Sequence, residues 1–370
     1  MDVLLLDAYD ADSHRRLREG LVAAFPAVRF TEHVLPPRHF AWRAGGNALA
    51  FGASVPRDSR PDLLLAAGPV DLATLRGLRP DLASVPAVLY VHEHEFAYPE
   101  NPREHGRPER QLRMVFALLA ADRVLANSRY CADTLLAGVE ALLARFPDAV
   151  PTGVAGRIAE RLAVAPIPLE DPLLAMPRRV RDPARPLEVV WNHRWEWDKG
   201  PDRLPVIVDV LERAGLRWRL HLLGRRFRTR PAAFDALEAR LPPGHPARGA
   251  WGRVEDRDAY RARLAEADVV LSTALHDFQG LSVLEAVALG CSPVVPARLA
   301  YPDFLPRGRL AVGDADDAER DGAALAARLL AEAERPTPAP DLGSLAWSRQ
   351  RAVWASQLGL PDDACAGGEP

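Results

Sequence analysis

Short apolar runs alternate with amphipathic segments along the first half of the chain. Residues 3–7 are apolar and end in a polar loop, and apolar positions then recur with helical spacing over residues 15–25. The alternation continues with expected strands at residues 62–66, 87–92 and 123–126 and expected helices at 111–121 and 130–145. Continuous apolar strands that alternate with helices are typical of a parallel, doubly wound sheet.

Proline and charge dominate residues 171–186, and this change of composition predicts a linker. The alternation then restarts, with expected strands at 187–194, 217–224, 267–274 and 292–297, helices at 202–214, 256–266, 283–289 and 322–333, and an aromatic amphipathic segment at 345–358. The pattern predicts an α/β protein with two doubly wound, Rossmann-like domains that face each other across a cleft. Ligands of such sheets bind outside the carboxyl ends of the strands.

The expected domain organisation has five segments. They are an N-terminal Rossmann-like domain at 1–170, the linker at 171–186, a C-terminal Rossmann-like domain at 187–342, a C-terminal helix at 343–360 and a disordered tail at 361–370. A chain of 370 residues is long enough for two hydrophobic cores. No apolar run approaches the roughly 20 residues of a membrane span, and the acidic opening is too short for a signal peptide. We therefore expect a soluble, cytoplasmic protein.

Charge and cysteine content narrow the function classes. The three cysteines, Cys131, Cys291 and Cys365, have neither metal-ligand nor disulfide spacing. A net charge of -3 argues against a dedicated nucleic-acid binder, which is usually basic as a whole. Arginine is nevertheless concentrated in two runs, one of Arg103, Arg107, Arg110 and Arg113 and one of Arg225, Arg226, Arg228 and Arg230. Either run could bind RNA phosphates, or both could be solvated faces.

Lys199 is the only lysine among 47 basic residues. It lies five residues after Arg194, in the loop between an expected strand and an expected helix near Pro201. Two cations beside a helix N-terminus suit a diphosphate leaving group, because they neutralise the charge that develops as the sugar departs. The alternative is a pair of solvated surface cations.

A second polar element surrounds Gly280, between Asp277 and Glu285. The glycine allows a close backbone approach, so that the N–H groups of Leu281 and Ser282 could bind phosphate. Glu285 could accept hydrogen bonds from a ribose, and Asp277 could meet sugar hydroxyls. The alternative is an acidic helix start with ordinary dipole complementation.

Together these two elements resemble the donor site of the retaining GT-B glycosyltransferases of family four. That resemblance places Arg194 and Lys199 on the diphosphate, Gly280 on the motif glycine and Glu285 on the second motif acid. The first acid of the family is usually Glu, whereas this chain has Asp277, which is one methylene shorter.

A narrower resemblance rests on many short segments in the same order over most of residues 2–306. They are DAYDADSHRRL, RHFAWRAGGNALAF, LYVHEHEFAYPE, AADRVLANSRY, WNHRWEWDKGPD, HDFQGLSVLEAV and CSPVVPARLAYPDFLP. The chain is similar through these segments to the tRNA-queuosine α-mannosyltransferase family. The resemblance implies GDP-mannose as the donor and the cyclopentenediol of queuosine, at a tRNA wobble base, as the acceptor.

The chain departs from that family in the acceptor half. A Gly-Gly pair is replaced by Ala11 and Asp12, and His-Glu-Asn-Gln reads as His-Glu-His-Glu at residues 92–95. A Tyr/Gly/Asn-rich stretch is replaced by the arginine-bearing residues 109–116.

His92 follows an expected strand, where family four places a histidine near the reacting sugar. We expect it to position the reactants, the alternative being a histidine that only caps its strand. His92, His94 and Glu95 lack a third well-spaced metal ligand, so no metal is expected. The expected acceptor-binding residues are Ser13, His14, Trp42, Arg43, Glu93, His94, Asn127 and Ser128. A helix N-cap is the alternative for Ser13, and buried packing is the alternative for Trp42.

The sequence thus predicts a retaining mannosyltransferase that uses a nucleotide-sugar donor and a tRNA acceptor without a cofactor, metal or membrane span. Its expected catalytic residues are His92, Arg194, Lys199 and Asp277. Two alternatives stay open. One is the same chemistry on a lipid, glycan or small metabolite, and the other is a non-catalytic sugar-nucleotide or RNA-binding module.

Overall fold

The structure, a computed structural model, describes all residues except 99–107, 180, 228–229, 362–363 and 365–370. The chain forms two compact units. Unit 1 comprises Met1–Pro168 together with Trp347–Pro370, and unit 2 comprises Leu169–Ala346. Most of the tail expected to be disordered lies outside the described residues.

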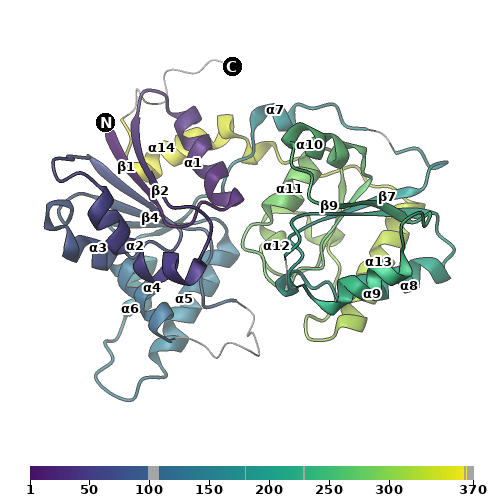
Figure 1. Cartoon of the computed structure of the whole chain (residues 1–370), viewed down its shortest axis with the longest axis horizontal. Coiled ribbons are helices and arrows are strands. Elements are labelled where there is room, and N and C mark those ends of the chain that lie inside the picture. The colour runs from purple at the N-terminus through teal and green to yellow at the C-terminus, as the bar shows by residue number, and fades with distance from the viewer. Residues whose placement is uncertain (99–107, 180, 228–229, 362–363, 365–370) are drawn as a thin grey trace. The chain divides into compact units, whose positions relative to one another are not determined.

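Unit 1 is built on a six-stranded parallel sheet with the order β2-β1-β3-β4-β5-β6 (Figure 1). Its strands are β1 (Asp2–Asp7), β2 (Arg29–Val34), β3 (Leu63–Ala67), β4 (Ala87–Val91), β5 (Arg123–Ala126) and β6 (Leu162–Val164). Its helices are α1 (Asp12–Ala24), α2 (Phe40–Ser54), α3 (Leu72–Leu78), α4 (Pro108–Ala120), α5 (Arg129–Leu143), α6 (Val154–Ala159) and α14 (Trp347–Leu358). The central strands β3 and β4 are buried at every position, as their continuous apolar sequences require.

The C-terminal helix α14 packs on unit 1, although its sequence follows unit 2. The Trp354 ring is fully buried and lies 5.3 Å from the Tyr90 ring of β4. Arg123 of β5 donates hydrogen bonds to the carbonyl oxygens of Ser356 and Gln357, at 2.9 and 3.0 Å. The last helix therefore completes the core that the first 168 residues begin.

Unit 2 has a five-stranded parallel sheet with the order β11-β10-β7-β8-β9. Its strands are β7 (Leu187–Asn192), β8 (Trp218–Leu223), β9 (Arg248–Gly252), β10 (Val269–Leu271) and β11 (Ser292–Val294). Its α-helices are α7 (Asp171–Leu174), α8 (Arg203–Arg213), α9 (Ala232–Arg240), α10 (Arg257–Glu266), α11 (Leu281–Ala288), α12 (Tyr301–Phe304) and α13 (Ala318–Glu334). The two parallel sheets confirm the expected α/β class.

Each sheet has one point at which the winding reverses direction. In unit 1 the chain moves from β1 to β2 on one side and then returns to β3 on the other. In unit 2 the strands β8 and β9 lie on one side of β7, and β10 and β11 lie on the other. Doubly wound sheets bind ligands beyond the carboxyl ends of the two strands at such a switch. The topology thus predicts that ligands bind at the loops after β1 and β3 in unit 1 and at the loops after β7 and β10 in unit 2.

The edge strands β2, β6 and β9 were missed by the hydrophobic pattern. β2 reads RFTEHV and has no fully buried residue, and all five residues of β9 are only partly buried. An edge strand is covered less completely than a central one, so its sequence carries a weaker apolar signal. The expected strand at 267–274 is ordered as β10 over only three residues, because the chain leaves the ladder at Ser272 to form a polar loop.

The proline-rich segment 171–186 begins with α7 and is part of unit 2. Arg179 is paired with Asp268, and Arg178 donates to the carbonyl oxygen of Ala339 at 3.2 Å. None of the helices in the described ranges is both long and apolar enough to cross a membrane.

Candidate functional site

The loops after β7 and β10 touch at the switch point of unit 2. The carbonyl oxygen of Asp198 accepts hydrogen bonds from the backbone N–H groups of Leu275 and His276, at 2.9 and 3.1 Å. Gly200 has φ +58°, and a Cβ added there would lie 2.2 Å from the carbonyl oxygen of Thr273. The two loops therefore approach so closely that only glycine fits at position 200.

The structure brings Arg194 and Lys199 to this junction in different environments. Lys199 is buried, and its Nζ donates to the carbonyl oxygen of His276 at 2.6 Å and lies 3.1 Å from Asp198 Oδ2. Arg194 has half of its side chain exposed, 3.0 Å from Glu196 and 3.9 Å from Asp198. An ammonium group has three donors, so Lys199 can bind a further acceptor without losing these two contacts.

Asp198 and His193 are buried next to these cations. Burial alone would raise the pKa of Asp198, but the charges of Lys199 and Arg194 and the hydrogen bond from Lys199 lower it below its usual value. Burial, reinforced by the charge of Lys199, lowers the pKa of His193 to about 4. The loop thus holds an ionised carboxylate and a neutral imidazole at neutral pH. Sequence reasoning missed both residues, although each directly precedes a predicted cation.

This neutral imidazole predicts an acid-sensitive step in stability. His193 stays unprotonated in the folded chain down to about pH 4, whereas an unfolded histidine binds a proton below about pH 6.5. Between these values the unfolded state binds more protons, so stability falls as the pH falls, by about 1.4 kcal/mol per pH unit for this one group.

We expect His193→Gln to remove that slope, so that the variant gains stability relative to the wild type as the pH falls from about 6.5 to about 4. Urea unfolding at a series of pH values measures the unfolding free energy of each protein. Parallel curves for the two proteins would contradict the assignment of His193.

Gly280, Leu281 and Ser282 lie at the start of α11, beside the end of β7. Gly280 is the N-cap with φ +75°. Asn192, the last residue of β7, donates its side-chain amide to the carbonyl oxygen of Ser282 at 2.7 Å. The first N–H groups of a helix have no partner within it, so they are available to an anion.

Asp277 is held by two donors. The backbone N–H of Gly280 donates to its Oδ1 at 2.9 Å, and the hydroxyl of Tyr301 donates to its Oδ2 at 3.2 Å. Tyr301 is fully buried and 2.7 Å from Ser272. Tyr301 was not among the predicted residues, because its role depends on a contact 24 residues away.

Glu285 lies in α11 with 1% of its surface exposed. Its Oε1 is 3.4 Å from Nε of Arg261, which donates from Nη2 to Glu170 at 2.7 Å. The structure therefore brings Glu285, Gly280, Lys199 and Arg194 together in one unit, with the Glu285 carboxylate paired to an arginine that sequence reasoning missed.

A second polar cluster lies at the switch point of unit 1. Asp7 ends β1 and is 3.0 Å from Nδ1 of His14, whose ring stacks on that of His92 with centroids 3.7 Å apart. Both nitrogens of His92 are buried without a hydrogen-bond partner in the described part of the chain. Burial and then the charge of His14 hold the pKa of His92 well below its usual value. A buried neutral imidazole with two unmatched nitrogens is suited to a polar ligand.

The residues around His92 divide into ligand candidates and structural partners. Asn127 donates to the carbonyl oxygen of His92 at 2.8 Å, while its own Oδ1 is buried and unmatched. Ser128 accepts from the N–H of Cys131 at 2.9 Å as the N-cap of α5. Nε2 of His94 is 3.2 Å from the carbonyl oxygen of Cys131, and Glu93 is exposed. Asn127 thus lies with His92, whereas Ser128 and His94 make contacts that support α5.

Two alternatives from the sequence are wrong. Ser13 is not a helix N-cap, because α1 begins at Asp12 with Ala11 as its cap. Trp42 is not buried packing, because 55% of its surface is exposed. Arg43, the next residue of α2, is partly buried. No group of three His, Cys, Asp or Glu side chains is arranged for a metal within the ranges that the structure describes.

Solved structures resemble the chain over nearly its whole length. The chain is similar to sucrose-phosphate synthase from Thermosynechococcus elongatus, with 15% identity, a TM-score of 0.69 and coverage of 96% of this chain and 98% of that one. It is also similar to the Escherichia coli trehalose-6-phosphate structure bound with UDP-2-fluoro glucose, with 15% identity, a TM-score of 0.66 and coverage of 96% of both chains. These likenesses show the fold, which is the GT-B fold of glycosyltransferases.

In sequence the chain is similar to one particular family. Residues 2–169 match the family described as the tRNA-queuosine alpha-mannosyltransferase N-terminal domain. The tRNA-queuosine alpha-mannosyltransferase of Drosophila melanogaster is 29% identical over 315 residues, which cover 83% of this chain and 82% of the relative. The match and the relative confirm the resemblance of the chain's short segments to the tRNA-queuosine alpha-mannosyltransferase family.

Proposed function

We propose that the protein transfers mannose from GDP-mannose to queuosine in tRNA, with retention at the anomeric carbon. One observation carries the donor half of this proposal. Two cations of the loop after β7 and the N-terminus of α11 converge at the switch point of unit 2. The family and the Drosophila relative support the choice of sugar and acceptor.

Unit 2 would bind the nucleotide-sugar. Arg194, Lys199 and the N–H groups of Leu281 and Ser282 would contact the diphosphate, whose charge grows as the glycosidic bond breaks. Glu285 would accept hydrogen bonds from the ribose, with Arg261 fixing its carboxylate. Because these groups meet the charge of the diphosphate, the proposal invokes no metal.

The reaction needs no protein nucleophile. The bond from the mannose anomeric carbon to the diphosphate oxygen breaks, and a bond to a hydroxyl oxygen of the acceptor forms on the same face. The proton of that hydroxyl passes to the departing diphosphate, which leaves as GDP. Asp277 would hold sugar hydroxyls, with Tyr301 fixing its orientation.

Unit 1 would bind the acceptor. His92 would hydrogen-bond the incoming hydroxyl or the sugar near the anomeric carbon, because its neutral ring offers one donor and one acceptor. Ser13, His14, Trp42, Arg43, Glu93, His94, Asn127 and Ser128 stay proposed contacts of the acceptor or its surroundings. A tRNA acceptor would place the protein in the cytoplasm.

The test is incubation of the protein with GDP-mannose and tRNA that contains or lacks queuosine. We expect GDP release and a mass increase of the tRNA only where queuosine is present. Equal inertness of both tRNAs would remove the tRNA acceptor. GDP-mannose turnover on another acceptor would then favour the same chemistry on a different substrate, and tight nucleotide binding without turnover would favour a non-catalytic module.

A further inference from the structure

We propose that α2 and α4 form a binding surface for single-stranded RNA, with a base stacked on Trp42 and phosphates on Arg43, Arg110 and Arg113. These four residues are called the α2–α4 surface below. The surface would hold the tRNA on unit 1 around the modified base. That tRNA is the natural partner rests on the proposed function.

The indole of Trp42 is arranged as a flat platform. A Cβ added to Gly46 would lie 2.5 Å from the Trp42 ring, so the indole lies directly against its own helix where glycine leaves room. Trp42 as a whole is nevertheless 55% exposed. One face is thus supported by α2 while much of the ring stays open to solvent. Bases stack on such aromatic platforms with little dependence on their identity.

The arginines of the α2–α4 surface keep their charge largely uncompensated. Arg43 and Arg113 form no ion pair with an acidic side chain of the described residues, and Arg110 is 3.7 Å from Glu95. A cation without a partner acid is available to a phosphate, and it releases counterions when the phosphate binds.

The second arginine run differs in this respect. Arg226 is 3.5 Å and Arg230 is 2.7 Å from Glu238, and both guanidinium groups lie over the Trp195 ring. The charges of these two residues are therefore balanced within unit 2. The comparison favours the first run for RNA, of which Arg103 and Arg107 lie outside the described residues, as does Arg228 of the second run.

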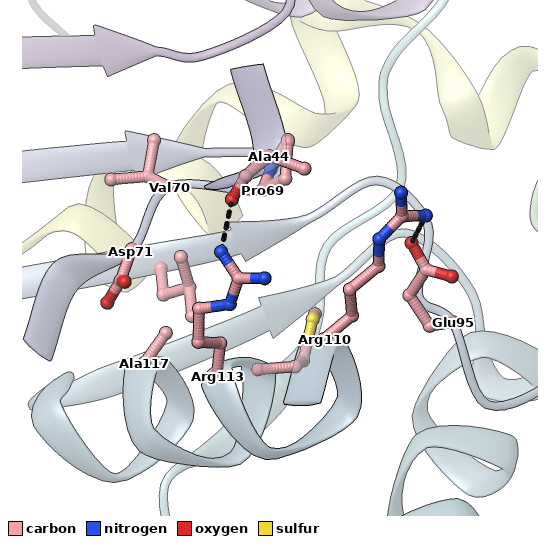
Figure 2. A pocket seen from close by; sticks show the side chains of 11 residues that line it. Ala44, Pro69, Val70, Asp71, Glu95, Arg110, Arg113 and Ala117 are labelled. Atoms are coloured by element: carbon pink, nitrogen blue, oxygen red, sulfur yellow. Dashed lines mark hydrogen bonds and ion pairs between the residues drawn. The ribbon is translucent and has the colours of Figure 1, made fainter. Parts of the chain in front are cut away.

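Direct contacts join the two helices into one surface. Arg113 Nη1 donates to the carbonyl oxygen of Ala44 at 3.5 Å, and the Arg110 guanidinium lies 5.9 Å from the centre of the Phe40 ring. Figure 2 shows Arg110 and Arg113 extending from α4, toward Glu95 and toward Ala44, at the two ends of a pocket.

That pocket lies beside the polar cluster of unit 1. Gly68 lines the pocket, and a Cβ added to it would lie 2.4 Å from the ring of His14. A nucleotide chain bound over α2 and α4 would therefore lie next to Gly68, behind which the buried rings of His14 and His92 stack. This is the geometry needed to bring one base of a loop to the reacting centre while neighbouring nucleotides bind outside it.

The test is the affinity of the full-length protein for an unmodified RNA hairpin of about 17 nucleotides and for a blunt duplex of the same length. We expect the hairpin to bind more tightly, because only its loop offers unstacked bases. Trp42→Ala should weaken hairpin binding by about 5- to 100-fold, which is the usual effect of removing one stacking partner. Gly46→Ala should also weaken it, because the new methyl group displaces the indole while alanine suits a helix.

Arg113→Ala and Arg43→Ala should each reduce the salt dependence of binding, by a slope of about 0.7 to 0.9 in log K against log salt for each phosphate that is no longer neutralised. Arg145→Ala is the matched control, because Arg145 is exposed at the end of α5 and has no side-chain partner in the described structure. It should leave both affinity and slope unchanged. Unaltered unfolding midpoints would show that each variant is folded.

Hairpin binding that is unaffected by Trp42→Ala and Arg113→Ala, or weakened equally by Arg145→Ala, would overturn the inference. The measurement contains no donor, so it is independent of sugar transfer. If the Trp42 and Arg113 variants bind RNA more weakly, the α2–α4 surface is supported even when no tRNA is mannosylated. If the protein mannosylates tRNA but these variants bind RNA as the wild type does, the α2–α4 surface is rejected and the proposed function stands.

Discussion

Lys199→Ala is expected to lower kcat for mannosyl transfer about a hundredfold or more, since removing one preorganised charge partner of a transition state has effects of about 10²–10³. The reason lies in its position. Lys199 is buried, anchored to the carbonyl oxygen of His276 and beside Asp198, so its remaining donor is held in a fixed direction where water is largely excluded. The rate of GDP release at saturating donor, measured for the variant and for the wild type, gives the two kcat values.

Arg194→Ala is the matched variant, and we expect a smaller effect on kcat. Half of the Arg194 side chain is exposed, and Glu196 lies 3.0 Å from it, so solvent and a competing carboxylate both weaken its field.

Lys199→Ala also leaves the buried Asp198 carboxylate with less charge compensation. The double variant Lys199→Ala/Asp198→Asn separates a folding defect from a catalytic one, because it removes that unpaired charge. Wild-type turnover in a folded Lys199→Ala protein would refute the proposed role.

Asp321→Ala is expected to destabilise unit 2 by about 3–5 kcal/mol, the usual cost of breaking a buried ion pair from one side. Asp321 of α13 is 1% exposed. It accepts from Arg203 Nε at 3.0 Å and from Arg298 at 2.8 and 2.6 Å. Its removal would leave the Arg298 guanidinium without a carboxylate among the described residues and Arg203 with Asp202 alone. Arg298 also donates to the carbonyl oxygen of Ala274, so the loop after β10 would lose support as well.

Urea unfolding at neutral pH measures this cost, with Asp316→Ala as the control. Asp316 is exposed and should change stability by no more than about 0.5 kcal/mol. The Asp321 contribution also has a defined pH dependence. Burial raises the pKa of Asp321, but hydrogen bonds and charges from Arg298 and Arg203 bring it below its usual value, so its stabilisation is present above about pH 4 and disappears as the pH falls through the native pKa. A destabilisation below about 1 kcal/mol would contradict the buried ion-pair assignment.

The central elements of both sheets could be predicted because burial leaves a strong mark on sequence. The strands β3 and β4 are apolar at every position. The motif residues Arg194 and Lys199 lie in the loop after a strand, and Gly280 directly precedes a helix. Local patterns do not record what a side chain meets in space. That is why the ring stack of His14 on His92 and the exposure of Trp42 could be known only from the folded chain.

Partners distant in sequence were missed for the same reason. Asp7 was read only as the end of a strand, yet it orients His14 through one short contact. Tyr301 and Arg261 carry no motif of their own, and their roles come from Asp277 and Glu285. A sequence motif readily identifies the residues that contact a ligand. It does not identify the residues that hold those ligand contacts in place.

The position of α14 has a consequence for how the polypeptide reaches its final form on the ribosome. Trp354 closes the core against β4, so the first 168 residues emerge from the exit tunnel long before the helix that covers them is made. Unit 2, residues Leu169–Ala346, is inserted between the two parts and is the only unit encoded without interruption. The half that would recognise the acceptor therefore completes its fold only after unit 2 has been synthesised.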